Sequence, residues 1–435
     1  MEEYFLIEGG KKLKGEIETY GAKNAATALI AATLLTSKRC FLKNIPPIKD
    51  VLVMLEILKS MGGEVEWKDK FSVSIRNKNI DPEKMDQSLV GKLRSSVLLI
   101  GPLLARFKKI KIRPPGGCVI GARSIESHLK VFSQFGIKIE TDKNFFYFER
   151  KNLKPKEVVL PEQSVTATEN ALMLASAIPG TSLIKLAALE PYPQELALFL
   201  NKLGAKIRIS PFSHAYLVSG KKEFKKGVSH FLIYDPIESG TFFALALASK
   251  RKLLIKGVHP EFLEAVFLKV REFGAEINFL KEKKSFRGEV KVEIIPPKNL
   301  KPISLQTLPY PGFPTDLQAP FSVPCTQAEG VSEIFEVMYE ARLNHLRELE
   351  KMGAKVKILN PHQAQIFGKT PLFGREIRSF DLRSGATMIL AALIAKGTSK
   401  IFEISQVDRG YFEIEKRLQK IGAKIERKKL SFEKN

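Results

Sequence analysis

The chain has 435 residues, of which 44% are hydrophobic and 27% are charged. This length exceeds what one hydrophobic core normally serves, so the sequence predicts two or three domains, and its composition excludes a disordered chain. The longest apolar stretches, such as residues 387–397, are too short to span a bilayer. The first ten residues lack the order of basic and apolar segments that marks a signal peptide. We therefore expect a cytoplasmic protein that does not insert into a membrane.

The formal net charge is +23. Such an excess can indicate nucleic-acid binding, but it can also keep a protein soluble or attract small anionic substrates. Because the basic residues are spread along the chain, we expect no nucleic-acid partner. The sequence carries no signal that fixes the oligomeric state. The three cysteines, Cys40, Cys118 and Cys325, are widely spaced and odd in number, so they predict neither a disulfide framework nor a metal site.

One pattern recurs six times, at intervals of about 70 residues. An amphipathic helix ends at a glycine, and a strand of alternating apolar and charged residues follows. The glycine predicts a helix end in a left-handed conformation, and the alternation predicts a half-buried antiparallel strand. The six glycines are Gly62, Gly136, Gly204, Gly274, Gly353 and Gly422.

Five of these units contain a second, more apolar helix earlier in the unit. Because these segments are apolar on nearly all sides, we expect them to be buried inside a domain. Thr166 and Asp235 are predicted to cap two of them. The fifth unit differs, because Pro320 could fit a first helical turn but Pro324 predicts a kink or a helix end. The predicted apolar helices are residues 23–36, 93–107, 166–178, 238–249 and 381–395.

The six units divide into two groups of three. We predict a domain of residues 22–233 and a second domain of residues 234–435, which a strand from residues 1–21 completes. A cleft between two such domains is the default place for a ligand.

Charged residues recur at the predicted starts of the helices in both domains. A lysine at a helix start can bind an anion, or its side chain can simply reach solvent. Taken together, these residues predict a cleft for a strongly anionic ligand that carries phosphate and carboxylate groups. The charged residues are Lys23, Arg94, Arg123, Asp381, Arg383, Asp408 and Arg409, and the polar Asn24 follows Lys23.

Two further residues invite a chemical interpretation. Asp316 follows the turn PYPGFPT and begins a helix, where it could be an acid stabilised by the helix dipole or a general base. Cys118 follows Gly116 and Gly117 in a loop with little apolar bulk, where it could be inert or a reactive thiol.

Seven segments have the order and spacing seen in one family of enolpyruvyl transferases, the UDP-N-acetylglucosamine 1-carboxyvinyltransferases. They are GAKNAA, RSSVLLIGPLLARF, PPGGCVIGAR, SVTATEN, FPTDLQA, DLRSGA and DRGY. The chain resembles this family over nearly its whole length. The Gly-Gly-Cys loop is the most specific segment, because the related shikimate-pathway enzymes have no such loop. The resemblance implies a two-domain inside-out α/β barrel of six repeated βα units.

The resemblance also implies a reaction. The enolpyruvyl group of phosphoenolpyruvate would pass to the 3-hydroxyl of UDP-N-acetylglucosamine by addition and elimination, with release of phosphate, as the first committed step of peptidoglycan synthesis. No metal and no cofactor are implied. Cys118, beside the positive charge of Arg123, would protonate the methylene carbon of phosphoenolpyruvate or add to it as a thiolate, and would be the target of fosfomycin. Gly116 and Gly117 would let the loop move as a lid.

The resemblance assigns the remaining roles residue by residue. Lys23, Arg123 and Arg409 would hold phosphoenolpyruvate, whereas Asn24 and Asp316 would meet the sugar, with Asp316 taking the proton from its 3-hydroxyl. Met338 would offer a backbone contact to the nucleotide sugar. The closed cleft would be supported by Lys49, Arg342, Asp381 and Arg383. The nucleotide-sugar site would be lined by Arg94, Arg123, Ser124, Ile125, Glu126, Ser127, Ser164, Val165 and Thr166.

Some residues depart from the family pattern. Thr166 stands where glycine is usual, Pro236 where arginine is usual and Ala341 where asparagine is common, and Pro320 and Pro324 follow Asp316 closely. The Thr166 departure keeps open enolpyruvyl transfer to a different acceptor alcohol. A catalytically silent nucleotide-sugar-binding relative is a further alternative, against which the joint presence of the catalytic residues argues.

Overall fold

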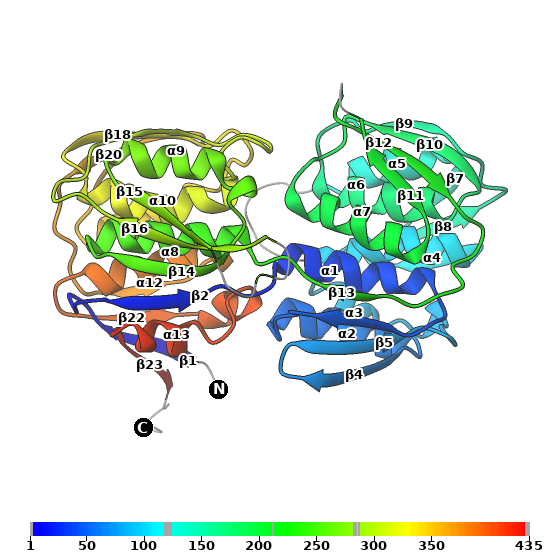
Figure 1. Ribbon diagram of the computed structural model, residues 1–435, viewed down its shortest axis with the longest axis horizontal. Coiled ribbons are helices and arrows are strands. Elements are labelled where there is room, and N and C mark those ends of the chain that lie inside the picture. The colour runs from blue at the N-terminus through cyan, green and yellow to red at the C-terminus, as the bar shows by residue number, and fades with distance from the viewer. Residues whose placement is uncertain (1–2, 117–123, 211–212, 282–284, 286–287, 431–435) are drawn as a thin grey trace. The chain divides into compact units, whose positions relative to one another are not determined.

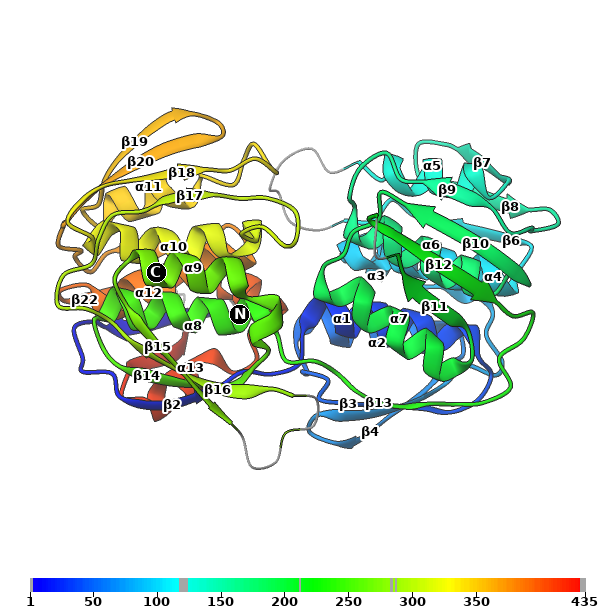
Figure 2. The same ribbon diagram turned by 45° about the horizontal axis from the view of Figure 1, so that its top comes forward.

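A computed structural model describes residues 3–116, 124–210, 213–281, 285 and 288–430. The chain forms two compact units. The central unit runs from Gly21 to Ile233, and the terminal unit combines the residues up to Tyr20 with those from Tyr234 onward. Within each unit the most apolar helices are buried, and the sheets lie around the helices (Figures 1 and 2). Burial of these helices was predicted because their sequences are apolar on nearly all sides, and the inside-out arrangement is the one that the family resemblance implied.

The central unit has three sheets. Their strands are β13 (Ser229–Phe231), β3 (Cys40–Lys43), β5 (Ser72–Arg76) and β4 (Glu64–Asp69) in the first, β6 (Lys109–Ile112), β8 (Phe146–Arg150) and β7 (Ile137–Thr141) in the second, and β11 (Lys206–Ile209), β12 (Ala215–Gly220), β10 (Gly180–Lys185) and β9 (Glu157–Val159) in the third. Its helices are α1 (Lys23–Ala32), η1 (Thr33–Leu35), α2 (Lys49–Ser60), η2 (Pro82–Lys84), α3 (Gln87–Val90), η3 (Arg94–Leu99), α4 (Ile100–Arg106), α5 (Glu126–Gln134), α6 (Val165–Ser176) and α7 (Pro191–Leu203).

The terminal unit also has three sheets. Their strands are β15 (Glu276–Lys281), β16 (Val290–Ile295), β14 (Leu253–Val258) and β2 (Gly15–Glu18) in the first, β17 (Ser304–Gln306), β18 (Gly330–Phe335), β20 (Gln363–Gly368) and β19 (Lys355–Asn360) in the second, and β21 (Glu376–Arg378), β22 (Thr398–Phe402), β1 (Glu3–Glu8) and β23 (Lys424–Lys429) in the third. Its helices are α8 (Pro236–Ser249), η4 (Pro260–Phe262), α9 (Glu264–Glu272), α10 (Thr315–Gln327), α11 (His345–Lys351), α12 (Leu382–Ile394), η5 (Ile404–Arg409) and α13 (Ile414–Lys420).

Five of the six sheets follow one scheme, which reflects the internal repeat. A short edge strand pairs in parallel with its neighbour, and the remaining two strands pair antiparallel. The scheme is completed by distant segments in three places. β13 closes the first sheet of the central unit, and β1 and β2 each enter a sheet of the terminal unit.

The repeated glycine pattern is confirmed. All six glycines have positive φ, from 82° at Gly136 to 123° at Gly204, just after a helix ends. Each is followed by an edge strand that pairs antiparallel with its neighbour. A Cβ at Gly136 would meet open space, so its backbone conformation, not crowding, requires glycine there.

The apolar helices are present and buried, with one difference at residues 93–107. This segment begins as the 3₁₀-helix η3 and becomes α-helical only at α4. The Asn170 side chain lies at this transition, because its Nδ2 donates to the Val97 carbonyl and its Oδ1 accepts from the Gly101 N–H. Those two groups would bond each other in a continuous α-helix, and Pro102 supplies no N–H of its own.

Two predictions about helix ends were wrong. Pro324 does not end its helix, because α10 continues to Gln327 with both Pro320 and Pro324 buried. α10 packs against α8 and α12 (Figure 2), and this tertiary packing outweighs the local cost of proline. Thr166 does not cap its helix either, because α6 starts one residue earlier and the Ser164 hydroxyl accepts from the Ala167 N–H at 3.4 Å.

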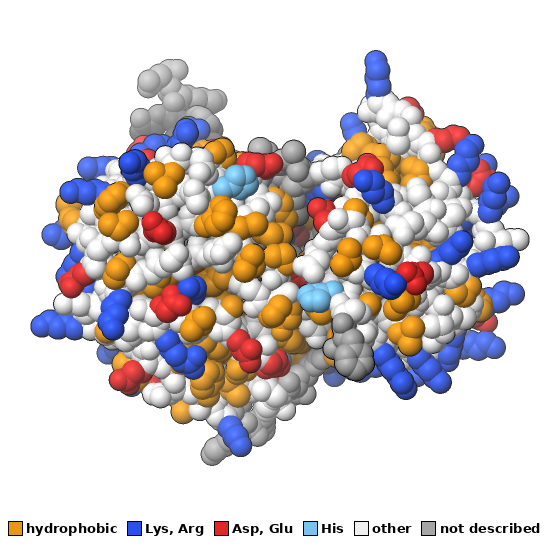
Figure 3. All heavy atoms as spheres, turned by 90° about the horizontal axis from the view of Figure 1, so that it is seen from above, with side chains coloured by type: hydrophobic (Ala, Val, Ile, Leu, Met, Phe, Trp, Pro, Cys, Tyr) orange, Lys and Arg blue, Asp and Glu red, His pale blue; other side chains and the backbone are white. Residues whose placement is uncertain are grey.

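The surface is rich in Lys and Arg, which are dispersed over the face shown in Figure 3 and form no continuous stripe there. Within the described ranges, no helix combines the length and the apolarity needed to cross a membrane.

Candidate active site

Asp316 is the centre of a charged cluster in the terminal unit. It lies in the first turn of α10, after the turn that precedes this helix. Arg342 Nη1 donates to Oδ1 at 2.8 Å, and Arg383 donates to Oδ2 through Nε at 3.0 Å and Nη2 at 2.9 Å. The two arginine side chains are 10% and 6% exposed, whereas that of Asp316 is 25% exposed. The carboxylate therefore keeps some access to solvent while both of its oxygens are held.

These contacts determine the protonation of Asp316. Burial opposes its ionisation, but the positive charges of Arg383 and Arg342 outweigh burial and hold its pKa well below the usual range. Asp316 is therefore an ionised hydrogen-bond acceptor at any pH near neutrality.

Arg383 is held in place from several directions. Asp381 caps α12 and accepts from the Arg383 N–H at 2.8 Å, as its predicted position at the helix start requires. Arg383 Nη1 donates to the Tyr411 hydroxyl at 3.1 Å, and Tyr411 in turn bonds Thr241 on α8. Nε and Nη2 face Asp316 while Nη1 faces Tyr411, and these contacts together fix the orientation of the guanidinium group.

Glu336 is a buried residue of this cluster that the sequence interpretation missed. It accepts from the Thr307 hydroxyl at 3.0 Å, the Met338 N–H at 2.9 Å and the Thr315 hydroxyl at 2.7 Å. It thereby joins the start of α10 to the backbone of Met338, the predicted nucleotide-sugar contact. An acidic residue within the apolar segment IFEVM was the available signal.

Arg409 is not at the start of the last helix, contrary to the prediction. Asp408 and Arg409 end η5, and α13 begins only at Ile414. Arg409 Nη1 donates to Gln406 Oε1 at 3.2 Å, and Asp408 accepts two bonds from Arg427, at 3.0 and 2.6 Å. Glu413, directly before α13, has a left-handed backbone conformation with a φ of 41°, so the helix begins later than the pattern indicated.

In the central unit, Lys23 links two helix starts. It is the first residue of α1, and its Nζ lies 3.1 Å from Asp50 Oδ2 in the first turn of α2. The two side chains are 18% and 7% exposed. Lys23 is therefore held at the helix start, next in sequence to Asn24, and does not simply extend into solvent. Lys49 begins α2 and directly precedes Asp50.

Arg94 and the start of α5 come together in the same unit. Arg94 begins η3, and its Nη2 donates to the Ser124 carbonyl at 2.8 Å. Glu126 is exposed, Ile125 is buried, and the buried Ser127 donates to Glu162 Oε1 at 2.5 Å. The Arg94 side chain is thus anchored to the backbone just before α5.

A neutral polar network connects this segment to α6. Thr166 Oγ1 lies 3.0 Å from Nε2 of His128, and the Asn170 Nδ2 lies 3.0 Å from Nδ1 of the same ring. Burial, together with the charge of Arg94, lowers the pKa of His128 to about 3. Neither His128 nor Asn170 was predicted from the sequence, although a histidine in a buried helix requires polar partners.

Cys118, Arg123 and Gly117 lie outside the described residues. Gly116 is described, and a Cβ there would lie 1.7 Å from the Gly91 carbonyl oxygen. Close approach of two backbones therefore requires this glycine, independently of any motion.

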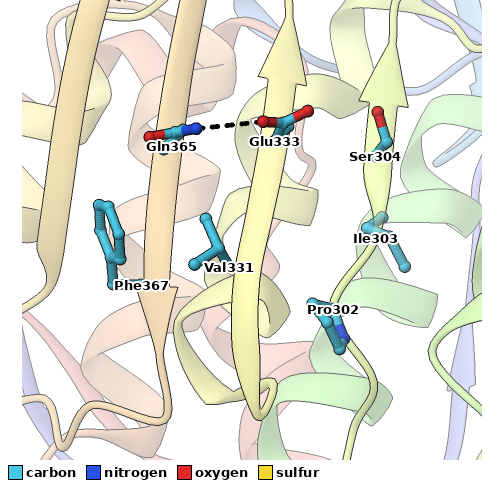
Figure 4. A pocket seen from close by; sticks show the side chains of 7 residues that line it. All are labelled: Pro302, Ile303, Ser304, Val331, Glu333, Gln365 and Phe367. Atoms are coloured by element: carbon cyan, nitrogen blue, oxygen red, sulfur yellow. Dashed lines mark hydrogen bonds between the residues drawn. The ribbon is translucent and has the colours of Figure 1, made fainter.

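A shallow hollow elsewhere in the terminal unit has different chemistry. It lies on the face of β17, β18 and β20, where Gln365 Nε2 donates to Glu333 Oε1 at 3.1 Å (Figure 4). None of the seven lining residues is cationic, so this hollow does not suit an anionic ligand.

Comparisons with known proteins agree with this architecture. Residues 7–418 match the family model described as EPSP synthase (3-phosphoshikimate 1-carboxyvinyltransferase). A solved enolpyruvyl transferase, NikO from Streptomyces tendae, superposes with a TM-score of 0.87 at 23% identity and covers 98% of this chain and 99% of its own. EPSP synthase from Acinetobacter baumannii superposes with a TM-score of 0.74 at 18% identity. The fold is thus that of the enolpyruvyl transferases, and the predicted inside-out barrel of six units is confirmed.

Relatives of higher sequence identity show which family of enolpyruvyl transferases the chain belongs to. UDP-N-acetylglucosamine 1-carboxyvinyltransferase 1 of Caldanaerobacter subterraneus is 40% identical over 98% of this chain and 100% of its own length. UDP-N-acetylglucosamine 1-carboxyvinyltransferase 2 of Clostridium tetani is 38% identical over 97% of this chain and 99% of its own. The chain belongs to the family of UDP-N-acetylglucosamine 1-carboxyvinyltransferases, as the resemblance predicted.

Proposed function

We propose that the protein transfers the enolpyruvyl group of phosphoenolpyruvate to the 3-hydroxyl of UDP-N-acetylglucosamine and releases phosphate, in the cytoplasm, as a step of peptidoglycan synthesis. The likeness to carboxyvinyltransferases over nearly the full length of both chains supports the substrates. The observation that carries the chemistry is the ionised Asp316, held by two arginines beside a buried helix start.

The reaction begins with the sugar hydroxyl. Its oxygen bonds to C2 of phosphoenolpyruvate while C3 gains a proton, and loss of phosphate with a proton from C3 then restores the double bond. Asp316 accepts the hydroxyl proton in this proposal. The arginines that keep Asp316 ionised also weaken it as a base, so the proton moves as the new C–O bond forms and not before.

Cationic residues of both units hold phosphoenolpyruvate in this proposal. Lys23 belongs to the central unit, whereas Asp316 and Arg409 belong to the terminal unit. Arg123 and Cys118 complete the proposed set, with Cys118 as the acid that protonates C3.

The test is phosphate release with both substrates, with the product identified by mass spectrometry, for wild type and Cys118→Ala. Wild type should form the enolpyruvyl nucleotide sugar, and Cys118→Ala should lose this activity by at least about a hundredfold, as expected for loss of a general acid. Fosfomycin should add to Cys118 alone.

Cys40→Ala is the matched control. Cys40 is buried, and burial raises the pKa of its thiol to about 11, so this cysteine should neither react with fosfomycin nor affect turnover. A folded wild type that makes no product and releases no phosphate would contradict the proposed function. If the protein consumes phosphoenolpyruvate only with another alcohol, that alcohol would replace UDP-N-acetylglucosamine as the proposed acceptor.

A further inference from the structure

We propose that the Thr166 hydroxyl donates a hydrogen bond to a diphosphate oxygen of the nucleotide sugar, and that His128 fixes the direction of this donor. The inference rests on the proposed function, because it takes a nucleoside diphosphate sugar as the ligand. It assigns a role to the side chain of Thr166 and makes His128 a positioning residue.

Asn170 can have only one amide orientation. Its Oδ1 faces the Gly101 N–H at 2.8 Å, which can only donate, and its Nδ2 faces the Val97 carbonyl at 2.9 Å, which can only accept. Reversing the amide would place its NH₂ group against the Gly101 N–H and its oxygen against the Val97 carbonyl oxygen. All of these groups are buried, so that arrangement would be strongly disfavoured.

The orientation of Asn170 determines the tautomer of His128. The second Nδ2 hydrogen of Asn170 points to Nδ1 of His128 at 3.0 Å, so Nδ1 must accept. The ring is fully buried, and with its lowered pKa it carries a single proton at neutral pH. That proton is therefore on Nε2, from which it is donated to Thr166 Oγ1 at 3.0 Å.

The Thr166 hydroxyl can consequently donate a hydrogen bond to a ligand. Its oxygen accepts from His128, so its own hydroxyl hydrogen points elsewhere, and no bond that uses this hydrogen is found among residues 3–116, 124–210, 213–281, 285 and 288–430. The side chain is partly exposed in the first turn of α6. A hydroxyl that already accepts from an N–H is a stronger donor, because hydrogen bonds in a chain polarise one another.

The charge around this donor favours an anionic oxygen as its acceptor. Arg94 lies near enough to His128 to help keep the ring neutral, and its Nη2 is anchored on the Ser124 carbonyl. A fixed guanidinium and an oriented hydroxyl suit phosphate oxygens better than neutral sugar hydroxyls. The alternative is that Thr166 only satisfies the buried His128 ring.

The test uses Thr166→Val, which has the same shape without the hydroxyl, and Thr166→Ser, which keeps it. Binding of UDP and of uridine is measured by calorimetry, together with the KM values for UDP-N-acetylglucosamine and phosphoenolpyruvate. We expect Thr166→Val to weaken UDP binding and raise the KM for the nucleotide sugar by about tenfold, as for loss of a hydrogen bond to a charged group. Uridine affinity and the KM for phosphoenolpyruvate should stay within about twofold, and Thr166→Ser should resemble wild type.

The proposal would be overturned if Thr166→Val bound UDP as tightly as wild type, or if its affinity for uridine fell as much as its affinity for UDP. It would also be overturned if Thr166→Ser lost as much UDP affinity as Thr166→Val. If Thr166→Val does not fold, Thr166→Ala provides the same comparison, because the smaller side chain leaves room for water beside His128. Calorimetry with UDP does not depend on turnover. An inactive wild type therefore counts against the proposed function, whereas an intact UDP affinity in an active Thr166→Val counts against this inference alone.

Discussion

Asp316 in the terminal unit is largely buried and His128 in the central unit is fully buried, and both titratable side chains lie near helix starts. Asp316 is ionised, whereas His128 is neutral. Burial disfavours the charged form of each. Around Asp316, Arg383 and Arg342 overcome burial, so the carboxylate stays ionised. Around His128, Arg94 acts in the same direction as burial, so the imidazole stays neutral. The charge of the neighbours, and not the depth of burial, decides the outcome.

The difference extends to what each group can offer a ligand. The ionised Asp316 can only accept hydrogen bonds, and its partners are fixed donors. The neutral His128 donates to the Thr166 hydroxyl, which can in turn donate to a ligand. On the proposed function, the terminal unit supplies the acceptor for a proton and the central unit supplies donors for anionic oxygens.

The largest expected effect is that of Asp316→Asn. The amide cannot take a proton from the sugar hydroxyl, so kcat should fall by about 10²- to 10⁴-fold, the usual contribution of a general base. Steady-state phosphate release measures this. Asp86→Asn is the control, because Asp86 also stands at a helix start but accepts from Ser88 and Leu89 of its own helix, and asparagine caps a helix as well as aspartate does. A kcat within threefold of wild type for Asp316→Asn would remove Asp316 from the proton transfer.

The next effect is on the pH profile. Because the pKa of Asp316 is held below its usual range, its ionised form is lost only at a pH lower than an ordinary carboxyl requires, and kcat/KM of wild type should show no acid limb from this group above about pH 4. Arg383→Lys removes the two-pronged contact and should bring an acid limb to higher pH. Arg342→Lys removes only one bond to Asp316 and should shift it less. Identical profiles in all three proteins would mean that the arginines do not control the charge of Asp316.

Much of the fold could be predicted from the repeats. A glycine that ends a helix and an alternating strand that follows it are local signals, and all six copies were placed correctly. Pro324 and Thr166 were misjudged for the same physical reason. Local propensity cannot register that α10 is packed between two other helices, or that Ser164 reaches the N–H one turn on.

The candidate site was predictable only in its charged residues. Asp316 and Arg383 were chosen from their places at predicted helix starts and Arg342 through the family resemblance, and the structure brings all three together. Glu336, His128 and Asn170 were missed, because their roles arise from contacts between segments far apart in sequence. The Asn170 amide, for example, bridges the backbone of Val97 and Gly101, some 70 residues earlier.

The smallest expected effect tests the neutral state of His128 without any substrate. The folded protein leaves this ring unprotonated down to a pH of about 3, whereas the unfolded chain protonates it near pH 6.5. Stability should therefore fall as the pH drops below 6.5, by about 1.4 kcal/mol for each pH unit from this group alone. In His128→Gln this contribution disappears, so the variant should lose about 2 kcal/mol less than wild type between pH 6.5 and pH 5 in urea unfolding. His214→Gln, at an exposed histidine, is the control and should follow wild type.

An unchanged pH dependence in His128→Gln would mean that the ring is charged in the folded protein. Both ring nitrogens would then be donors, the Asn170 contact would be lost, and the contrast with Asp316 would no longer hold.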